Sequence, residues 1–237
     1  MGSPRWFFGM ARPWMWSFAV LGIAMVTTGC IWGLFFAPPD YQQGDSFRII
    51  YIHVPAAHLA EALYVMLGVA GVVFLVWRMK LADMFIAVTA PVGIAITGTA
   101  LLTGAIWGRP TWGAWWVWDA RTTSVLVLFF LYVGLVALRQ AIPRAQAAAR
   151  AASVLAIVGT VNIPIIKYSV DWWLTLHQPA SLSTSGASMP ASMWVPLVIN
   201  IFGFYFFIGA VLLGALRHEV LQREAGTQWV RDWVRGA

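Results

Sequence analysis

Residues 84–106 read MFIAVTAPVGIAITGTALLTGAI, a stretch that contains no charged side chain. A helix of roughly 20 residues crosses the hydrocarbon core of a bilayer, which is about 30 Å thick. Comparable apolar runs occur at about 16–36, 54–77, 124–138, 149–166 and 194–216. The sequence therefore predicts an all-α integral membrane protein, a bundle of six transmembrane helices that forms a single membrane domain over residues 1–237.

The composition agrees with a chain that has lipid as its solvent. Hydrophobic residues make up 60% of the sequence and charged residues only 10%, with a mean hydropathy of +0.75. A soluble domain carries roughly 25% charged residues. The net charge of +6 could suit nucleic acid, but the basic residues lie in short clusters between apolar runs, where they orient helices. We expect no nucleic-acid partner.

The basic residues also predict the orientation. One side of the predicted membrane collects 11 of the 15 Lys and Arg residues and the other side collects 4. The first group is Arg5, Arg12, Arg78, Lys80, Arg139, Arg144, Arg150, Arg217, Arg223, Arg231 and Arg235, and the second is Arg48, Arg109, Arg121 and Lys167. By the positive-inside rule both termini are cytoplasmic. The loops near 37–53, 107–123 and 167–193 then face outward.

The second of these outer loops is rich in tryptophan. Residues 107–121 read WGRPTWGAWWVWDAR and contain Trp107, Trp112, Trp115, Trp116 and Trp118. An aromatic belt at the lipid headgroups is the alternative, but a belt spreads its rings over all helix ends. Gly108 and Gly113 permit close approach of the backbone to a ligand. Indole faces suit stacking against an extended π-system, so we interpret the loop as a platform for a planar ligand.

Two histidines belong to the same outer face. His53 precedes Pro55, which suits the first turn of the second span, and His177 lies in the third outer loop. Neutral imidazole is the usual nitrogen ligand of haem iron. Two imidazoles from opposite sides, with the Trp loop against the ring, predict a six-coordinate haem. With Cys30 as the one cysteine and no Cys-x-x-Cys-His motif, this haem b is non-covalent.

His58 is the competing ligand. It follows His53 by five residues, which is about 140° further round a helix, so the two could not readily bind one iron. His58 and Glu61 share a helix face, and we interpret them as an intramembrane polar pair directed at the bundle interior, because lipid-facing placement is costly. Proton handling or contact with a partner subunit remains open for this pair.

Three charged residues flank the Trp cluster. Arg109 and Arg121 have the guanidinium geometry that pairs with carboxylates, and haem carries two propionates. Pairing with Asp119 or with lipid phosphates is an equal alternative for both arginines. For Asp119 we favour a structural role, because an Asp before a helix accepts hydrogen bonds from its free amides.

These residues also carry a resemblance to a known family. The string at 107–121 resembles the WWD signature of haem-handling proteins. Three further segments resemble the CcmC family of the bacterial cytochrome c maturation system, namely FAPPDYQQG at 36–44, RIIYIHVPA at 48–56 and NIPIIKYSVDWW at 162–173. Other members of the superfamily are longer, so six spans in 237 residues favour CcmC.

The resemblance implies a location and a role. CcmC-like proteins lie in the bacterial inner membrane, hold haem at the periplasmic face between the histidines that match His53 and His177, and pass it to the haem chaperone CcmE. They work with the small membrane protein CcmD and the ABC transporter subunits CcmA and CcmB. We therefore expect presentation of haem rather than enzymatic catalysis, with ATP use by a partner because the chain has no P-loop.

Two other functions compete with this interpretation. A cytochrome b-type anchor passing electrons to quinone usually buries both histidines within the spans, whereas here only His58 lies clearly inside one. A haem exporter or permease subunit needs a path through the bundle, and intramembrane polar groups are scarce. Whether haem arrives from lipid, through this chain or through a partner is left open by the sequence.

Overall fold

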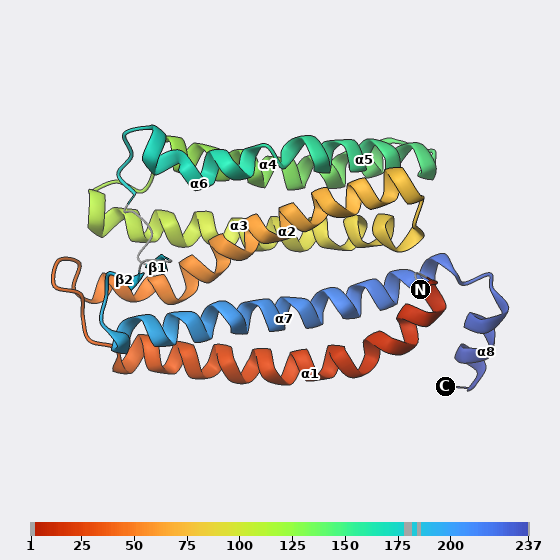
Figure 1. The fold of residues 1–237 in the computed structure, drawn as a ribbon, viewed down its shortest axis with the longest axis horizontal. Coiled ribbons are helices and arrows are strands. Elements are labelled where there is room, and N and C mark those ends of the chain that lie inside the picture. The colour runs from red at the N-terminus through yellow and green to blue at the C-terminus, as the bar shows by residue number, and fades with distance from the viewer. Residues whose placement is uncertain (1–2, 178–181, 184–185, 237) are drawn as a thin grey trace.

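The computed structural model describes residues 3–177, 182–183 and 186–236 of the chain (Figure 1). Its helices are α1 (Pro4–Ile31), α2 (Ile50–Trp77), α3 (Lys80–Trp112), α4 (Ala120–Ala141), α5 (Ala145–Gly159), α6 (Asn162–Trp172), α7 (Ala191–Arg223) and α8 (Gln228–Gly236). One π-helical turn (Trp32–Phe36) extends α1, and a 3-10 turn (Asp45–Ile49) leads into α2. The strands β1 (Leu182–Ser183) and β2 (Gly186–Ala187) form a short antiparallel hairpin.

The long helices run side by side in three layers. Helix α1 packs along α7, α2 packs along α3, and α4 lies beside α5 and α6 (Figure 1). Within the described residues, six helical segments are long and apolar enough to cross a membrane: Pro4–Phe36, Asp45–Trp77, Lys80–Trp112, Ala120–Ala141, Ala145–Trp172 and Ala191–Arg223. The prediction of an all-α bundle with six membrane-spanning segments is confirmed, and each segment is longer than its predicted apolar run.

Glycines set the closeness of the α1–α7 pair. A Cβ atom at Gly22 would lie 2.4 Å from the backbone nitrogen of Phe207, and one at Gly203 would lie 2.8 Å from that of Val26. In a membrane the hydrophobic effect does not drive helices together, because lipid tails are as apolar as the side chains. Small residues allow close backbone packing, which stabilises the helix pair instead. Close backbone contact at these glycines therefore helps to hold α1 against α7, together with ring contacts such as Phe18–Phe206.

The fifth predicted span, at 149–166, is two helices rather than one. Pro164 has no amide to bond the Thr160 carbonyl, and its ring crowds that position. The Ile163 amide bonds that carbonyl instead, at 3.0 Å, and the helix restarts at Asn162. The break turns α6 relative to α5 near the end of the bundle that carries the candidate site.

The predicted tryptophan loop at 107–123 is shorter than expected. Helix α3 continues through Pro110 to Trp112, and α4 begins at Ala120. The Thr111 hydroxyl donates to the Trp107 carbonyl at 2.7 Å, and the helix ends at Gly113, whose φ of 78° is in the left-handed region. The connection between α3 and α4 is thus residues 113–119, and Trp107 and Trp112 are helical.

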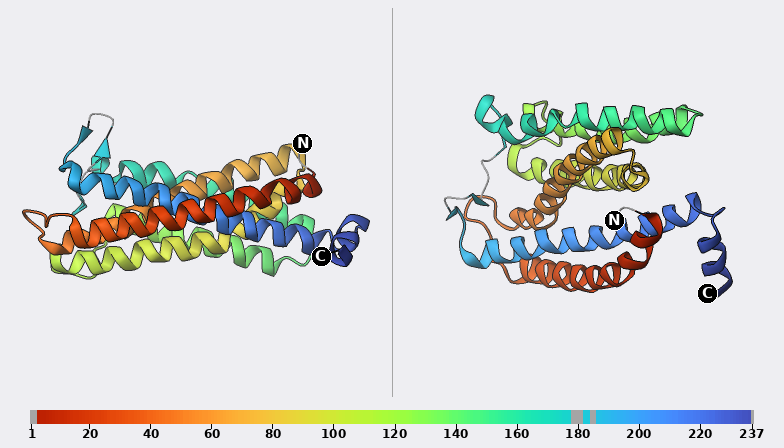
Figure 2. Two further views of the ribbon diagram at one scale, coloured as in Figure 1. Left: turned by 90° about the horizontal axis from the view of Figure 1, so that it is seen from below. Right: turned by 45° about the vertical axis from the view of Figure 1, so that its right-hand side comes forward.

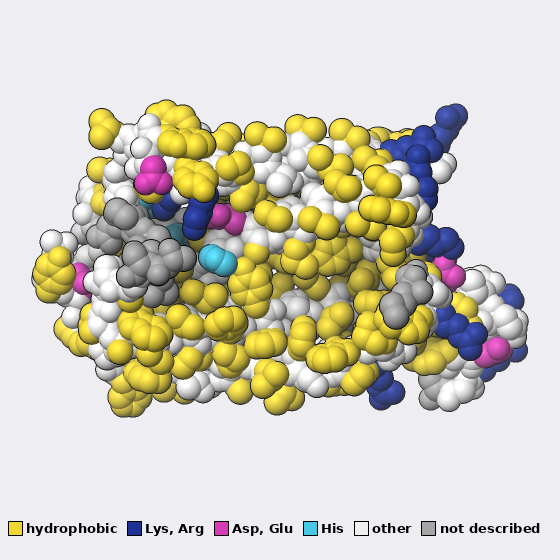
Figure 3. Space-filling view, in the orientation of Figure 1, with side chains coloured by type: hydrophobic (Ala, Val, Ile, Leu, Met, Phe, Trp, Pro, Cys, Tyr) yellow, Lys and Arg dark blue, Asp and Glu magenta, His cyan; other side chains and the backbone are white. Residues whose placement is uncertain are grey.

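The two ends of the bundle differ. Both ends of the described chain lie at one end, and the connections after α1, α3 and α6 lie at the other, which we call the loop end (Figures 1 and 2). Lys and Arg side chains gather at the end that carries the chain ends (Figure 3). There Asp83 of α3 pairs with Arg139 of α4 and Arg223 of α7. The predicted outer loops are therefore brought together at the loop end.

Candidate functional site

His53 lies inside α2, not at the mouth of a helix that starts with Pro55. The helix begins at Ile50, following directly from the 3-10 turn. The imidazole points at α3, where its Nδ1 is 3.0 Å from Oγ1 of Thr103. A Cβ atom at Gly104 would lie 3.0 Å from Cε1 of the ring, so glycine gives the imidazole its space on α3.

The Thr103 contact fixes which nitrogen of His53 is available. The Thr103 hydroxyl donates its proton to the Thr99 carbonyl at 2.7 Å. Its oxygen is then left to accept, so Nδ1 of His53 is the donor and carries the ring proton. The Ala100 carbonyl, which lies 3.2 Å from the same Thr103 oxygen, is a second acceptor for the imidazole. Among the described residues, no side chain hydrogen-bonds Nε2 of His53. That nitrogen keeps a free lone pair, the form that binds a metal.

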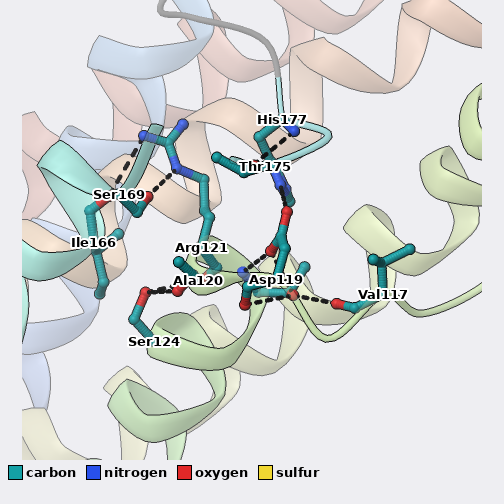
Figure 4. Close-up of polar contacts among 10 residues, drawn as sticks. Val117, Asp119, Ala120, Arg121, Ser124, Ile166, Ser169, Thr175 and His177 are labelled. Carbon is teal, nitrogen blue, oxygen red and sulfur yellow. Dashed lines mark hydrogen bonds and ion pairs between the residues drawn. The ribbon is translucent and has the colours of Figure 1, made fainter. Parts of the chain in front are cut away.

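His177 also carries its ring proton on Nδ1, but its hydrogen-bond partner is a carboxylate. It lies in the loop after α6, where its Nδ1 is 3.0 Å from Oδ2 of Asp119 (Figure 4). Its own amide donates to Oγ1 of Thr175 at 2.8 Å. A carboxylate can only accept, so Nδ1 is again the donor. Nε2 of His177 has no hydrogen bond to any residue that the structure describes.

The two carboxylate oxygens of Asp119 accept hydrogen bonds from different parts of the chain. Oδ1 accepts from the Thr122 amide at 2.8 Å and from the Thr122 hydroxyl at 2.7 Å, which caps the N-terminus of α4 as predicted. Oδ2 orients His177, a role that the sequence analysis did not assign. Burial by itself would raise the pKa of Asp119, but the hydrogen bonds from Thr122, His177 and Thr175 bring it below its ordinary value.

The same contact matters for the charge of His177. Burial lowers the pKa of this imidazole, and the hydrogen bond to the Asp119 carboxylate only partly opposes that effect. The net pKa lies below the ordinary value of 6.5. His177 is therefore neutral at pH 7, as an iron ligand must be.

The last turns of α3 bring the two histidines to one place. The ring of Trp107 meets His53 edge-on, with centroids 5.6 Å apart, and Trp112 meets His177 at 4.7 Å. Nε1 of Trp107 donates to Oε1 of Gln43 at 2.7 Å. The imidazoles are close enough to interact electrostatically. Sequence positions 53 and 177 thus meet across one helix end.

Of the three remaining tryptophans of the cluster, two are exposed and one is partly buried. Trp115 is 61% exposed and Trp118 is 75% exposed. Trp116 packs edge-on against Trp118, with centroids 5.4 Å apart, and its buried Nε1 has no hydrogen-bond partner among the described residues. A buried donor without a partner costs free energy unless a ligand or water satisfies it. The loop therefore offers two exposed ring faces and one unused N–H.

The two glycines of the predicted platform serve the packing of the chain. Gly113 supplies the positive φ that ends α3. At Gly108 a Cβ atom would lie 3.1 Å from Cε3 of Trp112 and 3.1 Å from the Ala114 carbonyl oxygen. Close approach is required at Gly108 alone, and the groups that approach it belong to the protein; at Gly113 a Cβ atom would have no neighbour within 4 Å, and only the positive φ calls for glycine.

Neither arginine of the cluster bonds Asp119. Arg109 donates to the Gly113 carbonyl at 2.8 Å and is exposed. Nε of Arg121 donates to Oγ of Ser169 at 3.1 Å (Figure 4). Arg121 also reaches the carbonyls of Ile166 and Lys167, which ties α4 to α6. Of the two alternatives, pairing with Asp119 is not what the structure shows.

The prediction that His58 faces the bundle interior is wrong. Its ring is exposed, and Nδ1 lies 2.8 Å from the hydroxyl of Tyr205 on α7. Residue 58 lies on the edge of α2 that meets α7, so its polar partner comes from that helix. Within the described residues Glu61 has no hydrogen bond to His58. The two residues do share the same side of α2, as their spacing predicted.

Several contributors escaped the sequence analysis. Thr103, Thr175 and Gln43 act by holding a histidine or a tryptophan, and only the fold reveals which polar residue meets which ring. Trp172 and Trp173, at the end of α6, are 56% and 51% exposed and pack against each other.

The donor set suits iron in a porphyrin. In the described part of the chain, no group of three or more His, Cys, Asp and Glu side chains could enclose a bare metal ion. Two imidazoles with free Nε2 atoms are the axial set of a haem whose other four positions are filled. Trp107 and Trp112 lie against these two imidazoles, and Trp115 and Trp118 are exposed on the adjoining connection.

Comparison with known proteins adds a relationship to this geometry. Residues 1–231 match the family model CcmC, described as heme exporter protein C. The chain is 46% identical over 226 residues to a heme exporter protein C of Escherichia coli (strain K12), covering 95% of this chain and 90% of the relative. One from Bradyrhizobium diazoefficiens is 46% identical over 215 residues, covering 89% and 79%. A ccmC-like mitochondrial protein of Marchantia polymorpha is 38% identical over 221 residues, covering 90% and 94%.

Proposed function

The chain belongs to the CcmC family, and from that premise we propose that it binds haem non-covalently at the loop end and presents it for transfer during cytochrome c maturation. One observation carries the proposal. His53 and His177 come from different elements, meet at the end of α3, and each commits Nδ1 to a protein oxygen while Nε2 stays free. That arrangement supports axial ligation of iron by both imidazoles.

The partners of Nδ1 support this assignment. A metal-bound histidine usually donates its other N–H to a carboxylate or another oxygen, which fixes the tautomer and raises ligand basicity. Asp119 supplies a carboxylate to His177, and Thr103 supplies a hydroxyl to His53. When bound, haem supplies the iron and the macrocycle; the chain supplies orientation, neutral ligands and ring contacts.

The exposed part of the site suits a handover. Trp115 and Trp118 lie on the short connection 113–119 with more than half of each ring uncovered. A haem edge beside them would remain accessible to a second protein. We infer that the receiving protein is the haem chaperone CcmE, and that this chain acts as a presenter rather than as an enzyme.

The location and the other partners belong to the same proposal. The gathering of Lys and Arg at the end opposite the site supports a periplasmic site in a bacterial inner membrane. CcmD, CcmA and CcmB are the expected partners. Reporter fusions at both chain ends test the orientation: cytoplasmic activity is expected, and periplasmic activity would contradict it.

Visible spectra test the proposed ligands. The protein, purified in mild detergent, should show sharp low-spin bands that are lost or shifted in His53→Ala and in His177→Ala. His58→Ala is the matched control, because it removes an imidazole from the same helix without touching the site. Bands that survive both outer substitutions and vanish in His58→Ala would move the site into the bundle and favour a redox anchor.

A further inference from the structure

An apolar groove opens on the side of the bundle, near the end that carries the chain ends. Its volume is about 440 Å³, within the range of roughly 300–1,000 Å³ that is usual for sites of small ligands. Every described residue that lines it is apolar, and the lining includes Phe7 of α1, Met66 and Val69 of α2, Phe85 of α3 and Leu216 of α7. A molecule that fills the groove therefore contacts both the α1–α7 pair and the α2–α3 pair.

A bend in α1 forms one wall of this groove. Pro13 lies within the helix, where its ring crowds the carbonyl of Gly9 and the helix bends in response. Figure 1 shows the first turns of α1 inclined to the rest of the helix. Phe7 lies on these first turns and lines the groove. The wall therefore depends on the course of the backbone.

The length of the groove fits one leaflet of a bilayer. On α2 the lining residues run from Val65 to Val73, which corresponds to about 12 Å along the helix axis. The hydrocarbon core is about 30 Å thick, so the groove extends through less than half of it. A partner helix that crosses the membrane would need a groove of the full length, whereas an acyl chain of one leaflet needs only half.

Cationic residues adjoin the lining at the end of the bundle. Arg78 and Lys80 flank Met79, which lines the groove, Arg5 lies two residues before Phe7, and all three cations are exposed. Lys80 pairs with Glu224 at 2.9 Å. Within the described chain, Arg5 and Arg78 make no side-chain hydrogen bond or ion pair. Basic pockets between transmembrane helices bind anionic lipid head groups, so these charges favour a lipid with a negative head group.

Arg78 also occupies a backbone position that favours glycine. Its φ is 56° and its ψ is 30°, and its amide ends α2 by donating to the Phe74 carbonyl at 2.9 Å. Among the described residues other than glycine, it alone has a positive φ. Helix α3 ends in the same way with Gly113. Since glycine would form this turn with less strain, the turn itself does not account for an arginine here, and such an outlier points to a role of the side chain.

We propose that the groove binds one anionic phospholipid, with an acyl chain along α2 and the phosphate beside Arg78 and Arg5. The bound lipid fills the space between the α1–α7 pair and the α2–α3 pair and so stabilises their packing at this end. The inference goes beyond the proposed function and does not rest on it, because the two histidines lie at the loop end.

Two lipids with the same acyl chains test the charge. The full-length protein in mild detergent is titrated with dioleoyl phosphatidylglycerol or dioleoyl phosphatidylcholine, and native mass spectrometry measures the fraction that carries one lipid. Phosphatidylglycerol should bind more tightly, by roughly fivefold for each cation engaged. Arg78→Gly should remove roughly fivefold of the phosphatidylglycerol affinity and leave phosphatidylcholine unchanged. Because glycine suits the backbone of residue 78, this loss would not reflect a disturbed turn.

Two tryptophan substitutions test the groove. Val69→Trp enlarges a lining side chain and should weaken the binding of both lipids. Val72→Trp is the matched control, because Val72 is exposed on the same helix but does not line the groove. Equal affinities of the unaltered protein for the two lipids, unchanged phosphatidylglycerol binding in Arg78→Gly, or equal effects of the two tryptophans would overturn the lipid site. The visible haem spectrum should be the same in all three variants, so the proposed function is tested separately.

Discussion

His53 and His177 present the same free nitrogen but are held by different kinds of structure. His53 lies within the long helix α2, against Trp107 and the small residue Gly104, and its partner Thr103 is a neutral hydroxyl. His177 lies on a loop, and its partner is a carboxylate that also caps α4. One imidazole is fixed by helix packing, and the other lies on a loop, where it contacts Asp119 and Trp112.

This difference shows how one site can combine a histidine in a fixed position with a histidine that is displaced more easily. Helices position groups more precisely than loops do, so in the proposed site His53 would define where the iron lies. A histidine on a loop can be moved at lower cost, because fewer buried contacts hold it. If haem is handed to another protein as proposed, His177 is the ligand that we expect to yield.

The largest expected effect comes from removing each imidazole and offering it back. His53→Gly and His177→Gly should each lose most of the low-spin haem absorbance. Added imidazole should restore the spectrum of His177→Gly, whose ligand sits on the loop side, more readily than that of His53→Gly, whose ring is enclosed between α2 and α3. The visible spectrum during an imidazole titration measures this. Equal rescue of both variants would show that the two positions do not differ in their access to added imidazole.

The Asp119 contact should rank second. Asp119→Asn keeps a good helix cap but removes the charge behind His177, and loss of such a partner typically costs 10–100-fold in affinity. We expect haem affinity to fall by roughly that factor while thermal stability changes little. Asp119→Ala removes both roles and should cost about 1 kcal/mol of stability in addition. Unchanged haem affinity in Asp119→Asn would show that the carboxylate only caps α4.

The Thr103 contact should matter less, because the helix already holds His53. Thr103→Val removes the acceptor for Nδ1 at nearly constant volume and should lower haem affinity by roughly tenfold, the low end for a supporting contact. Thr99→Val is the matched control on the same helix, since its hydroxyl bonds only the Ala95 carbonyl. A haem titration of both variants gives the result. Equal effects in the two would mean that Thr103 acts only through α3 itself.

The smallest effect expected near neutrality concerns pH. Because burial holds the pKa of His177 below 6.5, its imidazole stays neutral as the pH falls to that value. Bound haem should therefore keep its low-spin spectrum at pH 6.5 and lose it only on further acidification, when protonation of Nε2 competes with iron. Spectra recorded from pH 8 downward test this. Loss of the bands at or above pH 6.5 would contradict the assigned environment of His177.

The sequence was sufficient for the architecture. Uninterrupted apolar runs allow only helices in lipid, so six spans followed directly, as did the meeting of the outer loops. Trp107 and Trp112 were assigned to a loop because the apolar run ends at Ile106, whereas the helix continues to Trp112 and ends at Gly113. The extent of a helix near its end depends on such local contacts, which composition does not specify.

The residues that hold the two histidines, and the partner of His58, required the structure. Thr103 lies fifty residues from His53, and only the rotation of α3 against α2 places it at the imidazole. Asp119 could be predicted as a cap, because that role is local, but its contact with His177 spans two loops. For His58, hydropathy indicated that a partner is needed, and the packing of α7 determined that it is Tyr205.

A structure of the haem-loaded protein tests the central claim most directly. The account predicts iron between Nε2 of His53 and Nε2 of His177, with the Nδ1 contacts to Thr103 and Asp119 retained. Iron bound to His58, or ligation by only one of the two outer imidazoles with the other still turned away, would contradict it.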